Sequence, residues 1–162
     1  VALASSMADP AFRSAVTRAV RSTPVVLADG TMTAALGARW SAKARPTPAT
    51  LEDEGIAAHR ADDAAWLAGL SLVPATLVPH LTDDFRWGRL YAGVAEAPGQ
   101  PAIGIAAGTA VVLAPSGAAS VVGSSVVVAS GPAATSWVGA TGALGASGVV
   151  LDIFGDGEAL AR

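Results

Sequence analysis

Hydrophobic positions near the N-terminus follow a helical spacing. Phe12, Val16 and Val20 recur every four residues, which places them on one face of a helix. Asp9-Pro10 precedes them, and aspartate and proline are favoured as the N-cap and the first residue of a helix. Thr23-Pro24 follows, and proline is poorly tolerated inside a helix. The sequence therefore predicts a helix that begins after Asp9 and ends at Thr23-Pro24.

Beyond this helix the apolar positions come in short unbroken runs, which are typical of buried strands. Residues 25–27 (Val-Val-Leu) predict a strand of a parallel sheet that is covered on both faces. A turn at residues 28–33 and a short helix at residues 34–40 are expected to follow. Residues 75–78 predict a second strand of this kind. Further strands, separated by turns that contain Gly and Ser, are predicted at residues 103–105, 109–113, 118–122, 126–129 and 149–153.

The remaining segments fit between these elements. Residues 41–63 are polar and predict an excursion over the surface, whereas residues 1–3 could form the end of a strand. Thr82 or Asp83 is expected to cap a helix that carries Leu90 and Val94. A chain in which helices and strands alternate in this way predicts an α/β fold.

The composition excludes several classes of protein. Of the 162 residues, 52% are hydrophobic and only 14% are charged, which excludes a disordered chain. The net charge of −3, with Lys43 as the single lysine, excludes a polybasic face and hence a nucleic-acid partner. The chain has no cysteine and only two histidines, so no metal site is expected. It also lacks a Gly-x-Gly-x-x-Gly and a Walker A motif, and no cofactor is expected.

One long segment, residues 97–151, has no charged side chain, which raises the question of a membrane. A spanning helix needs roughly 20 consecutive, mostly apolar residues. Here Gly, Ser, Thr and Pro interrupt the apolar runs every few positions, so we expect strands and no membrane partner. No signal-peptide pattern is visible, which predicts a cytoplasmic location. The chain begins with Val1 and not with Met, so a fragment or a processed product is one interpretation.

The turn after residues 25–27 is the first candidate for chemistry. It reads Gly30-Thr31-Met32-Thr33-Ala34, with small residues on both sides of Met32. Nucleophile-elbow enzymes use small residues in this way around a serine that ends a strand. A thioether has no proton to lose and cannot act as an activated hydroxyl does. An ordinary strand–helix junction, in which Met32 packs against the core, is the alternative.

His80 and the charged residues after it are the second candidate. His80 follows the predicted strand 75–78, and strand ends are where the sites of α/β proteins gather. It could serve as a general base or as a hydrogen-bonded structural imidazole. Arg86 and Arg89, together with Asp83 and Asp84, could form a catalytic cluster, or they could be the solvated face of a helix.

Three segments together resemble the peptidase E and cyanophycinase family, which are serine hydrolases. Residues 25–40 (VVLADGTMTAALGARW) resemble its elbow strand and its Gly-x-Ser-Ala-Gly-Ala motif. Residues 69–90 (GLSLVPATLVPHLTDDFRWGRL) resemble the segment that leads to the catalytic His and ends in Arg-x-Gly-Arg-Leu. Residues 103–123 (IGIAAGTAVVLAPSGAASVVG) resemble the Gly-Ile-Asp-Glu-x-Thr-Ala strand and its hairpin. The similarity is collinear from about residue 25 to residue 128.

The resemblance implies a site that has lost its chemistry. Met32 takes the place of the nucleophilic serine, and Thr33 and Ala34 take the places of the Ala and Gly around the oxyanion-binding turn. His80 matches the catalytic histidine, with Val78 where the family usually has Asp. An alanine pair replaces the acidic pair of the Gly-Ile-Asp-Glu motif. The residues expected to border a binding site are Gly30, Ala34, Arg86, Arg89, Ala106 and Ala107.

The resemblance also implies a fold and a function. The fold is a three-layer, class I glutamine-amidotransferase-like (flavodoxin-like) sheet with C-terminal β-hairpins. Residues 1–162 form a single α/β domain, the C-terminal half to two-thirds of the family fold without its N-terminal strands. The expected function is a pseudo-hydrolase that acts as a subunit or binding scaffold. The alternative is an active peptidase or amide hydrolase that uses Thr31 or Thr33 with His80.

Three kinds of partner follow from these hypotheses. A second copy of the chain would make a homodimer, and an N-terminal portion or another subunit would complete the sheet. A peptide is the expected ligand of the site.

The uncharged residues 97–151 motivate a third class of function. In this class the chain is purely structural, and its apolar C-terminal half packs against another protein.

Overall fold

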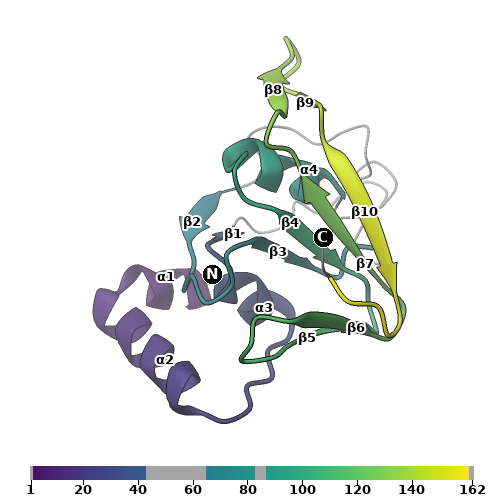
Figure 1. The fold of residues 1–162 in the computed structure, drawn as a ribbon. Helices are drawn as coiled ribbons and strands as arrows, with labels where there is room; N and C mark the ends of the chain where they lie inside the picture. The colour runs from purple at the N-terminus through teal and green to yellow at the C-terminus, as the bar shows by residue number, and fades with distance from the viewer. Residues whose placement is uncertain (1, 43–64, 83–86, 161–162) are drawn as a thin grey trace.

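The computed structural model describes residues 2–42, 65–82 and 87–160, which form a mixed α/β fold (Figure 1). The helices are α1 (Ala2–Ala8), α2 (Pro10–Ser22), α3 (Gly30–Leu36) and α4 (Trp87–Glu96). The main sheet contains β1 (Arg39–Ser41), β2 (Trp66–Ala68), β3 (Thr76–Pro79), β4 (Ala102–Ile105), β7 (Ser125–Ser130) and β10 (Val150–Gly155). Two hairpins lie outside it, formed by β5 (Ala110–Leu113) with β6 (Ala119–Val122) and by β8 (Thr135–Val138) with β9 (Leu144–Ser147).

The six-stranded sheet is mixed, with the order β10-β7-β4-β3-β1-β2. Its central strands β1, β3 and β4 are parallel to one another, and helix α4 connects β3 to β4, as is usual for parallel strands. The outer strands β2, β7 and β10 are antiparallel to their neighbours. The α/β class predicted from the sequence is therefore confirmed.

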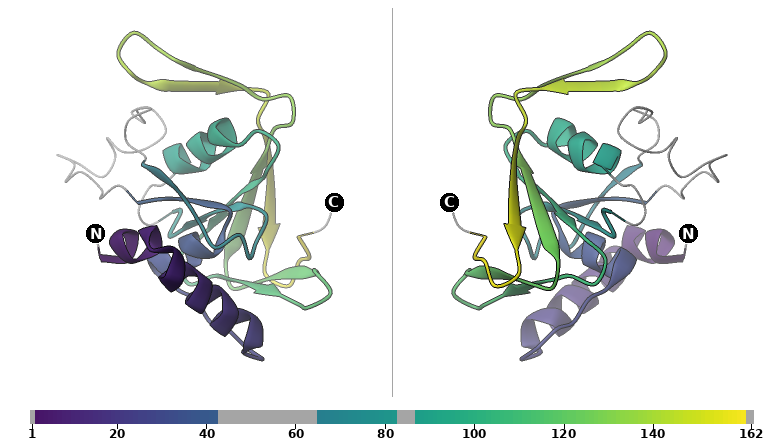
Figure 2. Two further views of the ribbon diagram at one scale, coloured as in Figure 1. Left: turned by 90° about the vertical axis from the view of Figure 1, so that its left-hand side faces the viewer. Right: turned by 90° about the vertical axis from the view of Figure 1, so that its right-hand side faces the viewer.

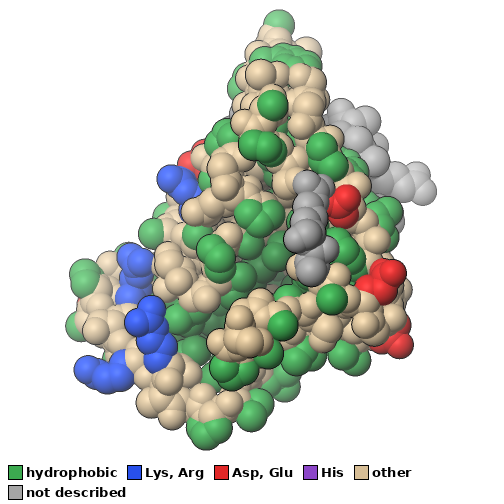
Figure 3. All heavy atoms as spheres, viewed as in Figure 1, with side chains coloured by type: hydrophobic (Ala, Val, Ile, Leu, Met, Phe, Trp, Pro, Cys, Tyr) green, Lys and Arg blue, Asp and Glu red, His purple; other side chains and the backbone are tan. Residues whose placement is uncertain are grey.

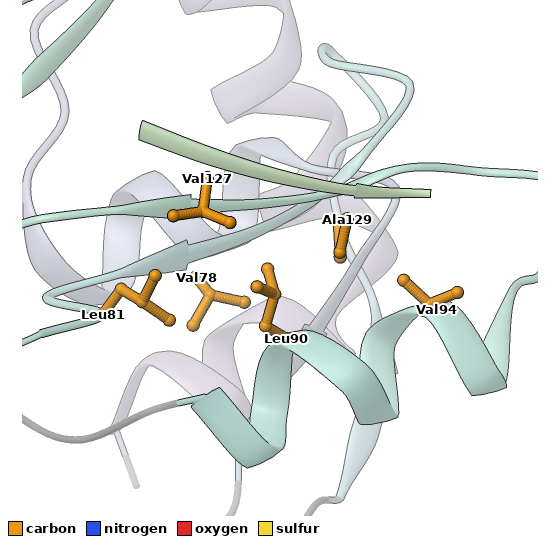
Figure 4. Close-up of a cluster of buried hydrophobic side chains, with 7 residues drawn as sticks. Val78, Leu81, Leu90, Val94, Val127 and Ala129 are labelled. Atoms are coloured by element: carbon orange, nitrogen blue, oxygen red, sulfur yellow. The ribbon is translucent and has the colours of Figure 1, made fainter. Parts of the chain in front are cut away.

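Helices cover both faces of the sheet at β3. Leu77 and Val78 are adjacent in an extended strand, so their side chains point to opposite faces. Leu77 packs with Leu36 of α3, whereas Val78 packs with Leu90 and Val94 of α4. Figure 2 shows α3 and α4 on opposite sides of the central strands, and Figure 4 shows the α4 side of this core.

Most predicted elements are present close to their predicted positions. Helix α2 starts after Asp9, whose carboxylate accepts a hydrogen bond from Ala11 N at 2.9 Å, and it ends before Thr23. The strands predicted from residue 75 onward correspond to β3, β4, β5, β6, β7 and β10. The turn glycine Gly123 has a φ of +112°, a conformation that other residues rarely adopt. These predictions are confirmed.

The strand predicted at residues 25–27 is wrong. Thr23 and Asp29 at its two ends have extended backbone, but the residues between them belong to no strand. The side chains of Val25, Val26 and Leu27 are 82%, 42% and 91% exposed. A buried strand needs a neighbour on the sheet, and none of the described strands pairs with this segment.

Several further elements differ from the prediction. Residues 2–8 form helix α1, where the end of a strand was expected at residues 1–3. The helix predicted at residues 34–40 is α3, which begins at Gly30 and ends at Leu36, and Trp40 lies buried in β1. The hairpin β8–β9 was not predicted. Residues 43–63 of the polar excursion and the helix cap at Asp83 lie outside the described residues.

Candidate functional site

The carboxyl ends of β3 and β4 place two of the predicted site segments side by side. Pro79 is opposite Ile105 in the parallel register, so the residues that follow, His80 and Ala106, leave the same edge of the sheet. Leu81 N donates to Ile105 O at 2.9 Å and fixes the turn after β3. His80 itself has a φ of +55°, which is uncommon for a residue other than glycine. This backbone conformation ends the strand at Pro79 and starts the turn.

The turn before α3 provides a third segment, because Asp29 lies next to His80. The distance from His80 Nε2 to Asp29 Oδ1 is 3.7 Å, which is within ion-pair range but too long for a direct hydrogen bond. Both side chains are accessible, with 40% of His80 and 94% of Asp29 exposed. The fold therefore joins a carboxylate and an imidazole from distant parts of the sequence in an open position.

Asp29 also accepts hydrogen bonds from the backbone amides at the start of α3. Its Oδ1 accepts from Gly30 N at 2.7 Å, and its carbonyl oxygen accepts from Met32 N at 3.1 Å and from Thr33 N at 3.5 Å. Amides at such a turn are the donors that would stabilise an oxyanion in an acyl-transfer enzyme. Here three of them are already engaged by one residue.

The three central residues of the predicted elbow lie in the first turn of α3. Met32 and Thr33 are half-buried and Thr31 is exposed. Met32 has an ordinary helical backbone, and the positive φ in this turn belongs to Gly30, at +53°. Among the described residues, neither threonine hydroxyl makes a hydrogen bond to His80. The contact between this turn and His80 is therefore made by the carboxylate of Asp29 and not by a threonine hydroxyl.

The alanines predicted at the site divide between the site edge and the core. Ala34 is buried in a cluster that includes Met7 and Trp40, and so it serves the packing of α3. Ala106 is buried beside the turn of His80, and its N–H donates to Ser125 O at 3.2 Å. Ala107 is half-buried next to it. Where the resemblance implies an acidic pair, this edge therefore has two methyl groups.

Within the described residues, the structure does not bring the predicted arginines together with the other site residues. Arg86 lies outside the described residues, and Arg89 is half-buried in the first turn of α4. Helix α4 packs its buried side chains, Leu90 and Val94, against the sheet. Val78, at a position where the resemblance implies Asp, is buried in the same core.

Asp29 is the one site residue that the sequence analysis did not single out. The available signal was its residue type: Asp29 lies in the turn predicted at residues 28–33, before the helix predicted at residues 34–40, and aspartate is favoured as a helix N-cap. Its contact with His80 depends on the fold and was not evident from sequence spacing.

Within residues 2–42, 65–82 and 87–160, no three His, Asp or Glu side chains gather closely enough to hold an ion. The helices in these same ranges are all too short or too polar to cross a membrane. No protein-family model matches the chain, and no curated protein matches it.

Two substitutions of Asp29 distinguish the effect of its helix cap from the effect of its negative charge beside His80. Asp29→Ala removes the cap of α3 and is expected to lower the free energy of unfolding by about 0.5–2 kcal/mol, whereas Asp29→Asn, which can still cap, is expected to change it by much less. Urea unfolding of both variants measures this. Equal losses in the two variants would show that the negative charge, and not the cap, is what stabilises this turn.

Proposed function

We propose that the chain is a relative of the peptidase E and cyanophycinase family that has lost hydrolase activity and acts as a binding scaffold or a subunit. The observation that carries this proposal is the side chain that faces His80. It is the carboxylate of Asp29. The resemblance gives Met32, which has no hydroxyl, the position of the nucleophile. The helices on both faces of a partly parallel sheet, with a histidine at the end of a parallel strand, support the three-layer fold that the family implies.

The chemistry of acyl transfer explains why this arrangement favours binding over hydrolysis. A serine–histidine system needs a hydroxyl within hydrogen-bond reach of the base and free donors for the oxyanion. Losing the nucleophile alone costs several orders of magnitude in rate. In this chain Met32 supplies no hydroxyl, and Asp29 holds the amides of Gly30, Met32 and Thr33. Both requirements are unmet at the same turn.

The exposed Asp29–His80 pair suits a peptide ligand. Asp29 offers acceptor oxygens, and the imidazole of His80 can donate or accept. The apolar edge at Ala106 and Ala107 lies beside them. A peptide could thus meet polar groups on one side of the sheet edge and methyl groups on the other, without any bond being broken.

The alternative function is hydrolysis by Thr31 or Thr33 with His80 as the base. Thr31 is exposed and lies in the same turn as Asp29, which contacts His80. A one-residue register change in this turn would present either hydroxyl in place of the carboxylate. The two functions differ in one measurable property, which is the presence of a nucleophile.

Covalent labelling with a fluorophosphonate probe tests the proposal. The wild-type chain is expected to show no mass increase by intact-mass spectrometry under conditions that fully label an ordinary serine hydrolase. Thr31→Val and Thr33→Val serve as matched variants, because valine replaces the hydroxyl by a methyl group of similar size. A wild-type adduct that disappears in either variant, or in His80→Ala, would establish the alternative and overturn the scaffold function.

A further inference from the structure

Helix α2 carries a group of basic side chains. Arg13, Arg18 and Arg21 line a shallow groove along the helix together with neutral polar residues. Arg13 donates to Gly69 O at 2.8 Å and is half-buried, whereas Arg18 and Arg21 are exposed. Figure 3 shows the basic side chains gathered over this helix. The negative net charge of the whole chain therefore does not describe this part of its surface.

No carboxylate neutralises the two exposed arginines. Among the described residues, none forms an ion pair with Arg18 or Arg21. Residues 10–28 contain no Asp or Glu. Asp9 caps the other end of α2, and a rise of about 1.5 Å per residue places it about 18 Å from Arg21 along the helix axis. This end of α2 is therefore complementary to an anionic partner.

An apolar segment, residues 25–27, follows directly after this basic helix. Val25, Val26 and Leu27 are 82%, 42% and 91% exposed. Figure 1 shows that α2 and the segment that leads from it to α3 extend away from the main sheet. Asp29, the next carboxylate along the chain, contacts His80. Three exposed apolar side chains and two exposed arginines thus lie next to each other at one end of the molecule.

These two features together favour a lipid surface over a protein partner. A partner that adds a strand needs an open edge of the main sheet, and residues 25–27 pair with neither of its end strands, β2 and β10. Consecutive side chains of a segment that is not helical point in different directions, so a rigid partner would have to enclose all of them. Fluid lipid can do so without a preformed pocket. Basic residues beside an inserted apolar segment are typical of proteins that bind membrane surfaces.

We propose that the end of α2 and residues 25–27 dock on a membrane surface that contains anionic phospholipid. Val25 and Leu27 enter the boundary between headgroups and acyl chains, and the guanidinium groups of Arg18 and Arg21 bind lipid phosphates. The expectation that the chain has no membrane partner concerned a spanning helix, and docking on the surface needs none. This inference does not depend on whether the site at His80 is catalytic.

Sedimentation with lipid vesicles tests the role of the arginines. The full chain is expected to sediment with vesicles of phosphatidylglycerol and phosphatidylcholine in equal parts, and not with phosphatidylcholine alone. Arg18→Gln and Arg21→Gln are each expected to weaken binding about fivefold, because each removes one basic group from the anionic surface. Arg39→Gln is the matched control, because Arg39 is paired with Glu96. It is expected to change binding less than about twofold.

A second pair of variants tests the apolar segment in the same assay. Val25→Ser is expected to weaken binding at least about fivefold, because the valine side chain no longer leaves water on docking. Val138→Ser is the matched control, since Val138 is 58% exposed on β8, at the opposite end of the molecule from α2 (Figure 1). It is expected to bind as the wild type does. Circular dichroism confirms that each variant is folded.

Soluble polyglutamate distinguishes a membrane from an acidic protein as the partner. Equal binding to polyglutamate and to the anionic vesicles, with Val25→Ser unchanged, would show that α2 recognises an acidic polypeptide and would overturn the proposal. So would a wild-type chain that binds neither kind of vesicle, or that binds both equally. Losses in Arg39→Gln and Val138→Ser as large as those in the α2 and Val25 variants would also contradict it, because docking would then not be confined to this end of the molecule.

Discussion

Gly69→Ala is expected to abolish stable folding, with a loss of at least about 3 kcal/mol in the free energy of unfolding. A Cβ atom at this position would overlap the carbonyl oxygen of Gly37 and would lie 2.9 Å from its carbonyl carbon and 3.0 Å from Ala35 O. All three atoms belong to the backbone, one in the last turn of α3 and two in Gly37 directly after it. No side-chain rotation can therefore relieve the overlap.

The backbone cannot move apart without breaking the hydrogen bonds that hold it. Gly69 N donates to Ala38 O at 2.9 Å, Leu70 N to Ala35 O at 2.8 Å and Ser71 N to Gly37 O at 3.0 Å. Each such bond contributes on the order of 1 kcal/mol, and a buried group left unpaired costs more. The substitution would thus detach the segment before β3 from α3 and β1.

Gly99→Ala is the matched control for this substitution. A Cβ at Gly99 would meet no atom within 4 Å, and its φ is not in the left-handed region. We expect its free energy of unfolding to stay within about 0.5 kcal/mol of the wild type. Urea unfolding followed by circular dichroism compares the two. If Gly69→Ala unfolds at the wild-type urea concentration, then the close approach of Gly69 to Gly37 is absent in solution.

Gly69 also shows what a sequence motif can reveal. It begins the segment of residues 69–90 in which the resemblance was noted, and its close contact gives a physical reason for a glycine there. Thr109 of the third segment is similar, because its Oγ1 accepts from Ser124 N at 2.9 Å and from Ser125 N at 3.3 Å. Both motif residues hold the fold together, so these motifs predict architecture and carry no evidence of activity.

Elements with local signals were predicted well from the sequence. Helix α2 has Asp9-Pro10 at its start and Thr23-Pro24 at its end, and these residues act within one turn of their position in the chain. Strands β4 to β7 are short, rich in valine and isoleucine, and bounded by glycine turns. In both cases the information lies within a few neighbouring residues.

Pairing between distant segments could not be predicted in the same way. Residues 25–27 have the composition of a buried strand, but a strand is buried only where a neighbour accepts it, and that depends on the rest of the sheet. The position of His80 at a strand end was predicted, because it follows from its own segment. Its contact with Asp29 was not, because it requires α3 and β3 to be brought together by the fold.

Leu90→Ala is expected to lower the free energy of unfolding by about 2–5 kcal/mol. Leu90 is fully buried and points from α4 toward the sheet, where it packs among Val78, Leu81 and Val127 (Figure 4). The substitution removes these contacts and leaves a cavity between helix and sheet. Helix α4 has only ten residues and is too short to be stable without such packing. Urea unfolding should therefore show an earlier and still cooperative transition.

The same substitution at Leu27 gives the sharpest comparison. Leu27 is 91% exposed, so Leu27→Ala is expected to change the free energy of unfolding by no more than about 0.5 kcal/mol. The two variants remove identical atoms from a buried and an exposed position, so burial is the main property that distinguishes them. If Leu27→Ala proved as costly as Leu90→Ala, residues 25–27 would be buried in solution. The strand predicted from the sequence would then be present, with a neighbour that the described strands do not provide.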